Sequence, residues 1–367
     1  MKTVYVGMSG GVDSSVTALL LKKQGFDIVG VYMKNWSQDL PGLPCPWKED
    51  YQDAQRVAVQ LDIPLKLFDF EKHYKHKVVD YMLAEYQAGR TPNPDIMCNQ
   101  EVKFKLFLDT ALEDGADLIA TGHYAITKNG RLFTAKDHNK DQTYFLHRLD
   151  QRQLRHALFP LADIAKPTVR ALAHTAGFAN HARKDSTGIC FIGERKFKDF
   201  LARYLPAQPG EIHTLAGARV GTHDGAMYYT IGQRQGLGIG GGGANTPWYV
   251  ADKDVARNIV YVVQGEDDPA LYRQTLTAEQ LHWIAGSAPA LPFACVAKTR
   301  YRQPAQACTI EQISDNIAHV RFAEAQRALT PGQSIVFYRD DECLGGGVIQ
   351  AHAAAAAPAA IARAALP

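Results

Sequence analysis

The 367-residue chain has few cysteines, and none of them are spaced like paired metal ligands. The six are Cys45, Cys98, Cys190, Cys295, Cys308 and Cys343. The absence of a C-x-x-C pair argues against a zinc knuckle and against a thioredoxin-type redox motif. A chain of this length does not need disulfides for stability, so some of these thiols are candidates for chemistry.

The sequence also lacks a long apolar run and a strong excess of charge. No segment is apolar enough to span a membrane, and a strand pattern begins within three residues of the N-terminus, which argues against a signal peptide. We therefore expect a cytoplasmic protein with no membrane partner. The net charge of +2 neither requires nor excludes nucleic acid. Contents of 46% hydrophobic and 21% charged residues indicate a globular protein with a sizeable core, and the length predicts two or three domains.

The first third of the chain alternates strand and helix patterns. Strands are predicted at 3–6, 26–33, 65–70 and 117–120, and helices from 12 onward and at 49–61, 73–86 and 104–112. This alternation predicts an α/β fold with a doubly wound parallel sheet, whose ligands bind at the carboxyl ends of the strands. The segment 7–14, Met33 and Gly122-His123 all fall at such ends, which favours a single nucleotide site.

The predicted secondary structure changes along the rest of the chain. Helices are predicted at 151–156, 166–176 and 196–204, followed by short β-type runs at 228–231, 248–250, 259–263, 317–322 and 335–338. Turn residues separate these runs, as in one or two small β-barrels. We therefore predict a catalytic domain with a helical extension at 1–208, a small β-rich domain at 209–280, a C-terminal β-barrel at 281–350 and a low-complexity tail at 351–367.

A glycine-rich loop directly follows the first strand. It reads Gly7-Met8-Ser9-Gly10-Gly11-Val12-Asp13-Ser14 and opens an apolar helical pattern. A strand, a tight Gly-Gly turn and a helix N-terminus form a nest of backbone N–H groups that suits phosphate. The loop contains no lysine and is neither a Walker A loop nor G-x-G-x-x-G. S-G-G-x-D-S instead resembles the pyrophosphate loop of ATP pyrophosphatases; the alternative is a Gly-Gly turn with a serine N-cap.

Two cysteines differ from the other four in their surroundings. Cys98 lies in the segment 89–99, where two prolines rigidify a predicted loop that presents Asn93, Asp95 and Cys98. Cys190 lies in the polar segment 184–193. Thiolate chemistry needs partial exposure and an electropositive neighbour, which both contexts offer. Cys295 and Cys308 are predicted to be core residues and Cys343 a turn residue, and Cys45 is ambiguous.

Six motifs in order give the sequence a specific resemblance. They are S-G-G-V-D-S, T-P-N-P-D-I-M-C-N, T-G-H-Y, K-D-Q-T-Y-F-L, D-S-T-G-I-C-F-I-G-E-R and T-I-G-Q-R-Q-G-L-G-I-G. Over about residues 1–350 the chain resembles the bacterial tRNA-specific 2-thiouridylases (the MnmA/TrmU family) of the pyrophosphate-loop ATPase superfamily. The Pro-rich segment 39–47 and the alanine-rich tail depart from that pattern.

The resemblance implies an activity and a set of site residues. ATP with Mg²⁺ would adenylate the C2 oxygen of the wobble uridine of tRNA, and a persulfide sulfur would replace that oxygen, giving 2-thiouridine, AMP and pyrophosphate. Cys190 would carry the persulfide and Cys98 would be the nucleophile. Cys98 would either attack the persulfide to liberate hydrogen sulfide or resolve it, leaving a transient disulfide between the two cysteines. Asp95 would act as general base or orient the base, and Asp13 is a candidate near Mg²⁺, with no fixed metal site. The ATP-binding residues would be Gly7, Met8, Ser9, Gly10, Gly11, Val12, Asp13, Ser14, Met33 and Gly122.

The resemblance also implies partners. The flipped uridine would be bound by Asn93, Pro94 and Asp95. The substrates would be the tRNAs for lysine, glutamate and glutamine, and a sulfur-relay protein would supply the sulfur. Contacts with tRNA would come from His123, Lys140, Asp141, Gln142, Arg300, Tyr301, Arg302 and Gln333. The stretch 298–303 interleaves basic and aromatic side chains, which suits phosphate contact with stacking; the alternative is a solvated sheet edge. His123 alternatively serves as a satisfied polar residue at the nucleotide site.

Two other functions remain open on the sequence alone. One is a pyrophosphate-loop enzyme of the amidotransferase or argininosuccinate-synthetase type, which adenylates an oxygen but uses a nitrogen nucleophile and needs no cysteine pair. The other is a non-catalytic tRNA-binding or sulfur-carrier protein, which needs no ATP site. The cysteines at 98 and 190 argue against the first, and the intact loop at 9–14 argues against the second.

Overall fold

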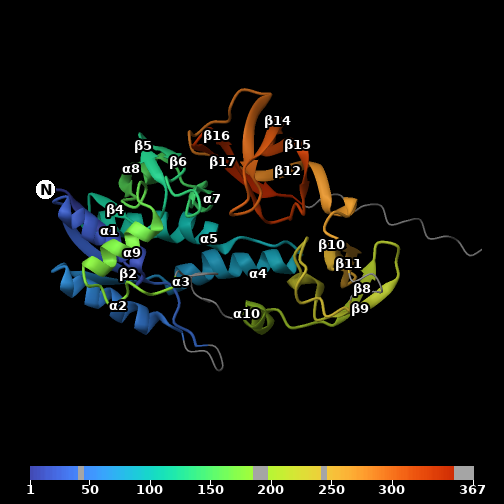
Figure 1. The fold of residues 1–367 in the computed structure, drawn as a ribbon, viewed down its shortest axis with the longest axis horizontal. Coiled ribbons are helices and arrows are strands. Elements are labelled where there is room, and N and C mark those ends of the chain that lie inside the picture. Colours follow the sequence, from blue (N-terminus) through green and yellow to red (C-terminus); the bar gives the residue numbers. More distant parts are fainter. Residues whose placement is uncertain (40–44, 185–196, 241–245, 351–367) are drawn as a thin grey trace, which may run out of the picture.

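The structure is a computed structural model that describes residues 1–39, 45–184, 197–240 and 246–350. Figure 1 shows an α/β half built from the first part of the chain, a C-terminal barrel above and beside it, and a small sheet of strands β8 to β11 next to both. In the ranges that the structure describes, no helix has the length and apolarity needed to cross a membrane.

A five-stranded parallel sheet forms the centre of the α/β half. It consists of β1 (Thr3–Gly7), β2 (Asp27–Lys34), β3 (Leu65–Asp69), β4 (Leu118–Ala120) and β7 (Ala157–Leu158), in the order β3-β2-β1-β4-β7. Helix α1 (Val12–Lys23) leads from β1 to β2 on one side, while β4 pairs with β1 on the other. The strand order therefore reverses beside β1, and the loop at 7–14 lies at this topological switch point. The predicted doubly wound sheet is confirmed.

Two hydrophobic clusters cover the two faces of this sheet. One contains α1, α2 (Trp47–Gln60) and α9 (Lys166–Thr175), whose apolar faces pack around Val4 and Val6 of β1. The other contains the helices between β3 and β4, packed around Tyr5 and Val31. Because both faces are buried, β1 and β2 are nearly continuous apolar runs, as expected for an all-parallel sheet.

The segment between β3 and β4 is more helical than the sequence predicted. It contains α3 (Glu71–Tyr74), a π-helical segment (Lys75–Val79), α4 (Asp80–Gln87), α5 (Pro94–Met97), a second π-helical segment (Cys98–Leu106) and α6 (Phe107–Glu113). The prediction of a loop through 89–99 is therefore wrong from Pro94 onward. The Asn93 side chain accepts hydrogen bonds from the N–H groups of Asp95 (3.2 Å) and Ile96 (3.4 Å), and Pro94 occupies the first turn, so a helix starts there.

A four-stranded sheet follows helix α10 (Phe197–Tyr204). It consists of β8 (Gly210–Thr214), β9 (Arg219–His223), β10 (Trp248–Asp254) and β11 (Ile259–Gln264), in the order β10-β11-β8-β9. The strand predicted at 228–231 is wrong. Ala226–Tyr228 forms a 3₁₀ turn instead, because Gly225, at φ 147°, redirects the chain and its carbonyl accepts a hydrogen bond from the Tyr228 N–H.

The C-terminal strands close into a barrel. They are β12 (Tyr272–Trp283), β13 (Phe293–Lys298), β14 (Gln306–Ser314), β15 (Ile317–Arg327), β16 (Ser334–Arg339) and β17 (Glu342–Ile349). Their order is β12-β15-β14-β13-β16-β17, and β12 also pairs with β17, which closes the ring. The domain limits stay a prediction, and β12 runs across residue 281. Cys343 lies buried in β17 rather than in a turn.

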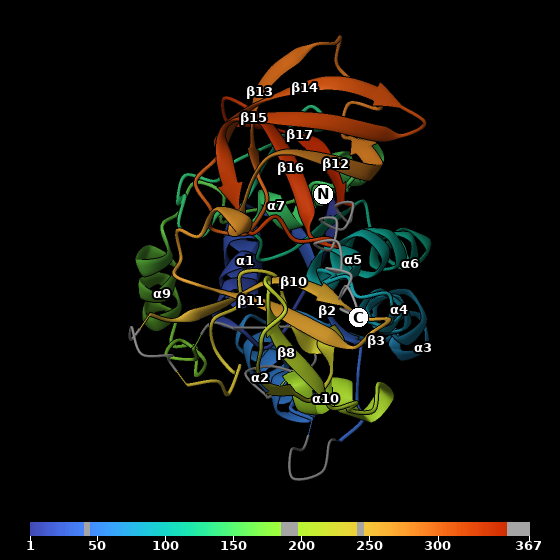
Figure 2. The same cartoon turned by 90° about the vertical axis from the view of Figure 1, so that its right-hand side faces the viewer.

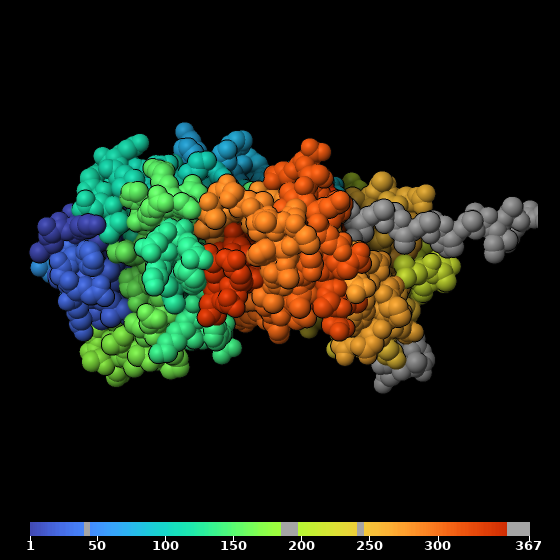
Figure 3. Space-filling view, turned by 90° about the horizontal axis from the view of Figure 1, so that it is seen from above, coloured from blue at the N-terminus to red at the C-terminus, as the bar shows by residue number. Residues whose placement is uncertain are grey.

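A hairpin absent from the sequence prediction joins the barrel to the α/β half. Strands β5 (Ile126–Lys128) and β6 (Arg131–Phe133) extend the barrel sheet, because Phe133 pairs with Glu342 of β17. Helices α7 (Thr143–Leu146) and α8 (Gln151–His156) follow it. Figures 2 and 3 show the orange-to-red barrel packed directly on the green segments of the first half. The hairpin, which follows β4 in the chain, thus joins the barrel sheet through β17, while the parallel sheet stays a separate sheet.

Candidate active site

The loop after β1 has the geometry of an anion-binding turn. Gly10 has φ 76°, and Gly11, at φ −85°, is the N-cap of α1. The hydroxyls of Ser14 and Ser15 donate to the Gly11 carbonyl at 3.0 and 2.9 Å, which fixes the loop against the first turn of the helix. Backbone N–H groups of a first helical turn have no partner within the helix, so this end of α1 is suited to an anion.

The chain after α9 anchors the loop from outside. Asn180 Nδ2 donates to the Gly10 carbonyl at 2.8 Å and to Ser15 Oγ at 2.9 Å. Arg183 forms ion pairs with Asp50 and Asp53 of α2, and its Nη1 lies 3.5 Å from the Gly10 oxygen. These contacts tie the Gly10 peptide to neighbouring elements, so the loop is held in place before any ligand arrives.

The acidic residue of the loop has two polar partners. Lys166 Nζ, from the first turn of α9, lies 2.6 and 2.7 Å from the two carboxylate oxygens of Asp13. The Tyr124 hydroxyl donates to Asp13 Oδ1 at 2.9 Å. The Asp13 side chain is 31% exposed and that of Lys166 only 9%, so the ammonium lies under the carboxylate.

Two other predicted nucleotide residues lie beside the loop. Met33 is near the end of β2, and its Cε would be 3.0 Å from a Cβ built on Gly7. A Cβ on Gly122 would lie 2.9 Å from backbone atoms of Asp13 and Ser14, so only glycine allows this close approach. The predicted grouping of 7–14, Met33 and Gly122 at one edge of the sheet is therefore seen in the structure.

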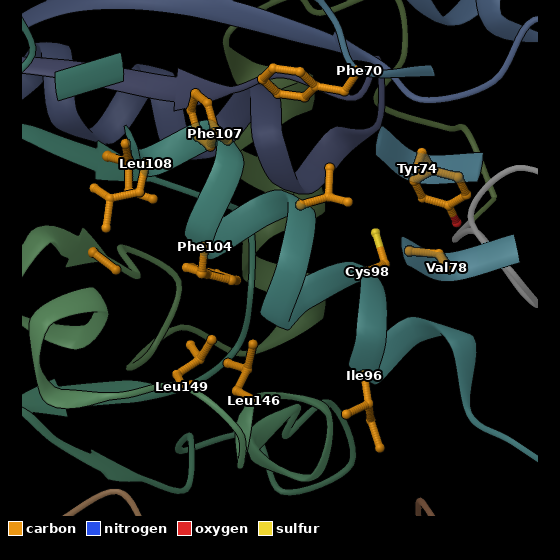
Figure 4. Packing of buried hydrophobic residues seen from close by; sticks show 14 of the residues in the cluster. Phe70, Tyr74, Val78, Ile96, Cys98, Phe104, Phe107, Leu108, Leu146 and Leu149 are labelled. Carbon is orange, nitrogen blue, oxygen red and sulfur yellow. The ribbon is translucent and has the colours of Figure 1, made fainter. Parts of the chain in front are cut away.

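Cys98 is placed differently from its prediction. Its side chain is 0% exposed and belongs to the large cluster of buried apolar residues. Figure 4 shows Cys98 close to Val78 and Tyr74, with Ile96 two residues earlier in the chain. The prediction of a partly exposed thiol is thus wrong for this conformation, because the π-helical turn directs residue 98 into the core. Cys190 and the rest of 185–196 lie outside the described residues.

The segment carrying Asn93 and Asp95 is tied to the barrel. Gln333 Nε2 donates to the Thr91 carbonyl at 2.8 Å and lies 3.4 Å from that of Pro92, while the Thr91 N–H donates to Pro331 O at 2.8 Å. The side-chain amide of Gln333 therefore positions the start of this segment. Asn93 and Asp95 are half-buried, whereas Pro94 is buried.

Several residues predicted to contact tRNA make their polar contacts within the protein. His123 is buried between Phe104 and Phe159 and lies 2.7 Å from Thr121 Oγ1, and burial lowers its pKa well below the usual value. Asp141 is buried, accepting from the Ala135 N–H and the Thr143 hydroxyl. Gln142 Oε1 accepts from the Tyr124 N–H at 3.0 Å, and Lys140 is half-buried. For His123, this geometry fits the alternative to tRNA contact, namely a polar residue whose hydrogen bond is made within the protein.

The stretch 298–303 is only partly a surface. Arg300 Nη2 donates to the carbonyls of Ile231 (3.0 Å) and Ala328 (2.9 Å), so it joins the barrel to the small sheet. The Tyr301 ring lies 4.4 Å from that of Phe145, centroid to centroid. Arg302 is exposed and lies over the Tyr301 ring at 5.4 Å. Arg302 is the exposed residue of these three, and contact of this stretch with tRNA stays a prediction.

Comparison with known proteins assigns the chain to a family. Residues 2–194 match a model described as the tRNA methyl transferase HUP domain, 198–264 its PRC-barrel domain and 273–349 an aminomethyltransferase β-barrel domain. A tRNA-specific 2-thiouridylase MnmA from Methylococcus capsulatus is 58% identical over 354 residues, covering 94% of this chain and 95% of the relative. One from Halalkalibacterium halodurans is 57% identical, covering 94% of each. The chain belongs to the MnmA family of tRNA-specific 2-thiouridylases.

Membership in the MnmA family makes this chain an enzyme of the tRNA sulfurtransferase class and confirms the resemblance found in the sequence. A solved 4-thiouridine synthetase–RNA complex with bound ATP is also similar, at 19% identity and a TM-score of 0.34, over 50% of this chain and 43% of that one. The relatives match nearly the full length of the chain, so the correspondence includes both β-rich parts.

Three residues of this MnmA-family site were missed by sequence reasoning. Lys166, Asn180 and Arg183 contact the loop but lie more than 150 positions after it. The pattern Lys166-Pro167 was a detectable helix start, with proline in the first turn. It gave no sign that the lysine would reach Asp13, because that contact depends on how α9 packs on α1.

Proposed function

We propose that this chain thiolates the wobble uridine of tRNA at C2, using ATP and a cysteine persulfide. The observation that supports this best is the 58% identity to a tRNA-specific 2-thiouridylase over nearly the whole chain, together with an intact loop at the switch point of the sheet. The substrate tRNAs are those for lysine, glutamate and glutamine, and a sulfur-relay protein supplies the sulfur.

The loop would bind the pyrophosphate part of ATP. In the adenylation step the C2 oxygen of the uridine bonds to the α-phosphorus, and the bond from that phosphorus to the bridging oxygen breaks. Pyrophosphate leaves with that electron pair. The rigid backbone N–H groups at Gly10, Gly11 and the start of α1 stabilise the charge that develops there, without reorganisation during the reaction. The adenine would lie toward Met33 and Gly122, at the neighbouring strand ends.

Mg²⁺ would enter with ATP. Its preferred ligands are oxygens, and the carboxylate of Asp13 at the loop meets that requirement. Among the residues that the structure describes, no group of three or more His, Cys, Asp or Glu side chains is placed to hold a metal. Asp13 would therefore supply one ligand, with phosphate and water oxygens completing the shell, and the ion would neutralise triphosphate charge.

The sulfur step would use the two cysteines. Cys190 carries a sulfane sulfur, and that sulfur replaces the adenylated oxygen, whose carbon–oxygen bond breaks to release AMP. The Cys98 thiolate attacks the Cys190 sulfur, so that the pair ends as a disulfide and the transferred sulfur leaves reduced. Asp95, in helix α5 directly before the π-helical segment that begins with Cys98, takes up or positions the proton on the uridine. Because Cys98 is buried, we infer that its helix must shift when tRNA binds.

Pyrophosphate release and thiouridine content, measured in one reaction, test the proposal. Wild-type protein with unmodified tRNA, ATP and a labelled persulfide donor should release pyrophosphate only when tRNA is present and should label the tRNA. Cys98→Ser and Cys190→Ser should release pyrophosphate but form no thiouridine, because a serine hydroxyl does not replace a thiolate at neutral pH. Mass spectrometry of Cys98→Ser should still find a persulfide on Cys190.

Cys308→Ser is the matched control, because Cys308 is a buried cysteine in the barrel core, far along the chain from the loop. It should keep wild-type thiolation with a modest loss of stability from burying a hydroxyl. Wild-type thiouridine formation by Cys98→Ser or Cys190→Ser would overturn the cysteine mechanism. Pyrophosphate release that does not depend on tRNA, with no labelled tRNA, would overturn the function itself.

A further inference from the structure

Lys166, a residue of α9, places a positively charged side chain beside the loop that follows β1, and that loop has no cationic side chain of its own. The segment 7–15 contains no lysine or arginine, so its own positive charge comes from backbone N–H groups. Lys166 brings an ammonium within 2.6 and 2.7 Å of the Asp13 carboxylate, in the first turn of α1. The Lys166 N–H donates to Asp137 Oδ2 at 3.0 Å, which fixes the backbone from which the side chain projects.

The shape of the site explains why this ammonium is held there. Lys166 is 7% exposed, and its Nζ lies 5.9 Å from the Tyr124 ring centroid. The Tyr124 hydroxyl binds the same carboxylate, so aromatic ring, carboxylate and ammonium form one compact group. A buried ammonium requires a fixed anionic partner, and Asp13 provides it in the conformation described.

We propose that Lys166 is a pyrophosphate-binding residue of this enzyme, held by Asp13 until ATP arrives. The proposal rests on the proposed function and adds to it a residue that binds the leaving group. With ATP bound, the β- and γ-phosphate oxygens replace the carboxylate as the partner of Nζ, which would leave the Asp13 oxygens available to Mg²⁺. The positive charge of the lysine stabilises the pyrophosphate as it leaves.

A chemically similar group at the opposite edge of the sheet provides a control. Lys66 Nζ pairs with Asp114 and lies 3.1 Å from the Tyr5 hydroxyl, which itself donates to Asp114 Oδ2 at 2.8 Å. Asp114 follows α6 and precedes β4, so this group is at the amino edge of the strands, away from the loop. The Lys66 side chain is 41% exposed. Both groups join lysine, aspartate and tyrosine, but only that of Lys166 adjoins the loop.

Equilibrium binding of the two halves of ATP tests the proposal. Inorganic pyrophosphate with Mg²⁺ probes the phosphate site, adenosine probes the base site, and ATP probes both. Lys166→Met should raise the Kd for pyrophosphate and for ATP about tenfold or more, the usual effect of losing a hydrogen bond to a charged group. The Kd for adenosine should change less than twofold. Lys166→Gln, which keeps a hydrogen-bonding group without the charge, should show the same loss and serves if the methionine variant fails to fold.

Lys66→Met should bind all three probes as the wild type does. A pyrophosphate Kd within twofold of wild type in the Lys166 variants would overturn the proposal. So would an equal loss of adenosine binding, since that would mean a general structural role. These outcomes are separate from the proposed function: a wild-type protein that binds pyrophosphate through Lys166 but never thiolates tRNA would refute the function and leave the binding role standing.

Discussion

Substitution of the two adjacent glycines of the loop, Gly10 and Gly11, should damage different properties of the protein. Gly10 has φ 76°, and a Cβ there would lie 2.3 Å from the Asp50 carbonyl oxygen. Gly11 has φ −85° and ψ 162°, which any residue adopts, and a Cβ there would meet only Ser9 Oγ, at 3.4 Å. We therefore expect Gly10→Ala to damage the fold and Gly11→Val to damage only the function.

The magnitudes follow from these geometries. The left-handed conformation costs a non-glycine residue about 1–2 kcal/mol, and moving α2 away from the clash adds a similar amount, for a total of about 3 kcal/mol. For a domain of about 200 residues this lowers Tm by about 6–12 °C. At Gly11 the reduced freedom of the unfolded chain offsets the poorer N-cap, so Tm should change by less than about 4 °C.

Thermal unfolding and pyrophosphate release together check this expectation. Gly11→Val should unfold near the wild-type temperature but release no pyrophosphate with tRNA and ATP, because its side chain occupies the space needed by phosphate. Its tRNA binding should persist. If Gly11→Val turns over ATP at the wild-type rate, the assignment of the loop is wrong. If Gly10→Ala unfolds at the wild-type temperature, the reasoning from φ and the Asp50 contact is wrong.

Three further predictions concern other parts of the chain. Arg302→Ala should reduce the salt-dependence slope of tRNA binding by about one unit with little change in Tm. Arg300→Ala should lower Tm instead, since it removes the hydrogen bonds to the Ile231 and Ala328 carbonyls that join the small sheet to the barrel; equal effects of the two variants on both quantities would contradict this. Gln333→Ala should lower thiolation more than ATP binding, as measured by thiouridine content and nucleotide Kd, because it releases the Thr91 carbonyl. Burial lowers the pKa of His147 from about 6.5 to about 3, so the unfolded chain binds the extra proton and the free energy of unfolding should fall as pH drops below about 6.5, by up to about 1.4 kcal/mol per unit. His147→Asn should flatten that slope in Tm measured between pH 8 and 5, and an unchanged slope would contradict the assignment.

The sequence alone determined the local features of the nucleotide half. The apolar run at β1, the Gly-Gly turn and the apolar periodicity of α1 predicted strand, loop and helix within a residue or two, because each depends on neighbours in the chain. The expected strands β2, β3 and β4 were likewise found in place. Parallel topology then required the loop, Met33 and Gly122 to meet at one edge.

Only the tertiary structure decided which polar groups face solvent and which face each other. Local pattern placed Cys98 and Arg300 in polar segments, but packing buries the first and bonds the second to the carbonyls of Ile231 and Ala328, in turns of two different domains. The contact of Lys166 with Asp13 joins residues 153 positions apart and depends on the packing of α9 against α1. The periodicity of apolar residues indicates which face of a single helix or strand is buried. Contacts such as that of Lys166 with Asp13 depend on how two elements are placed relative to each other, and no local sequence pattern encodes that placement.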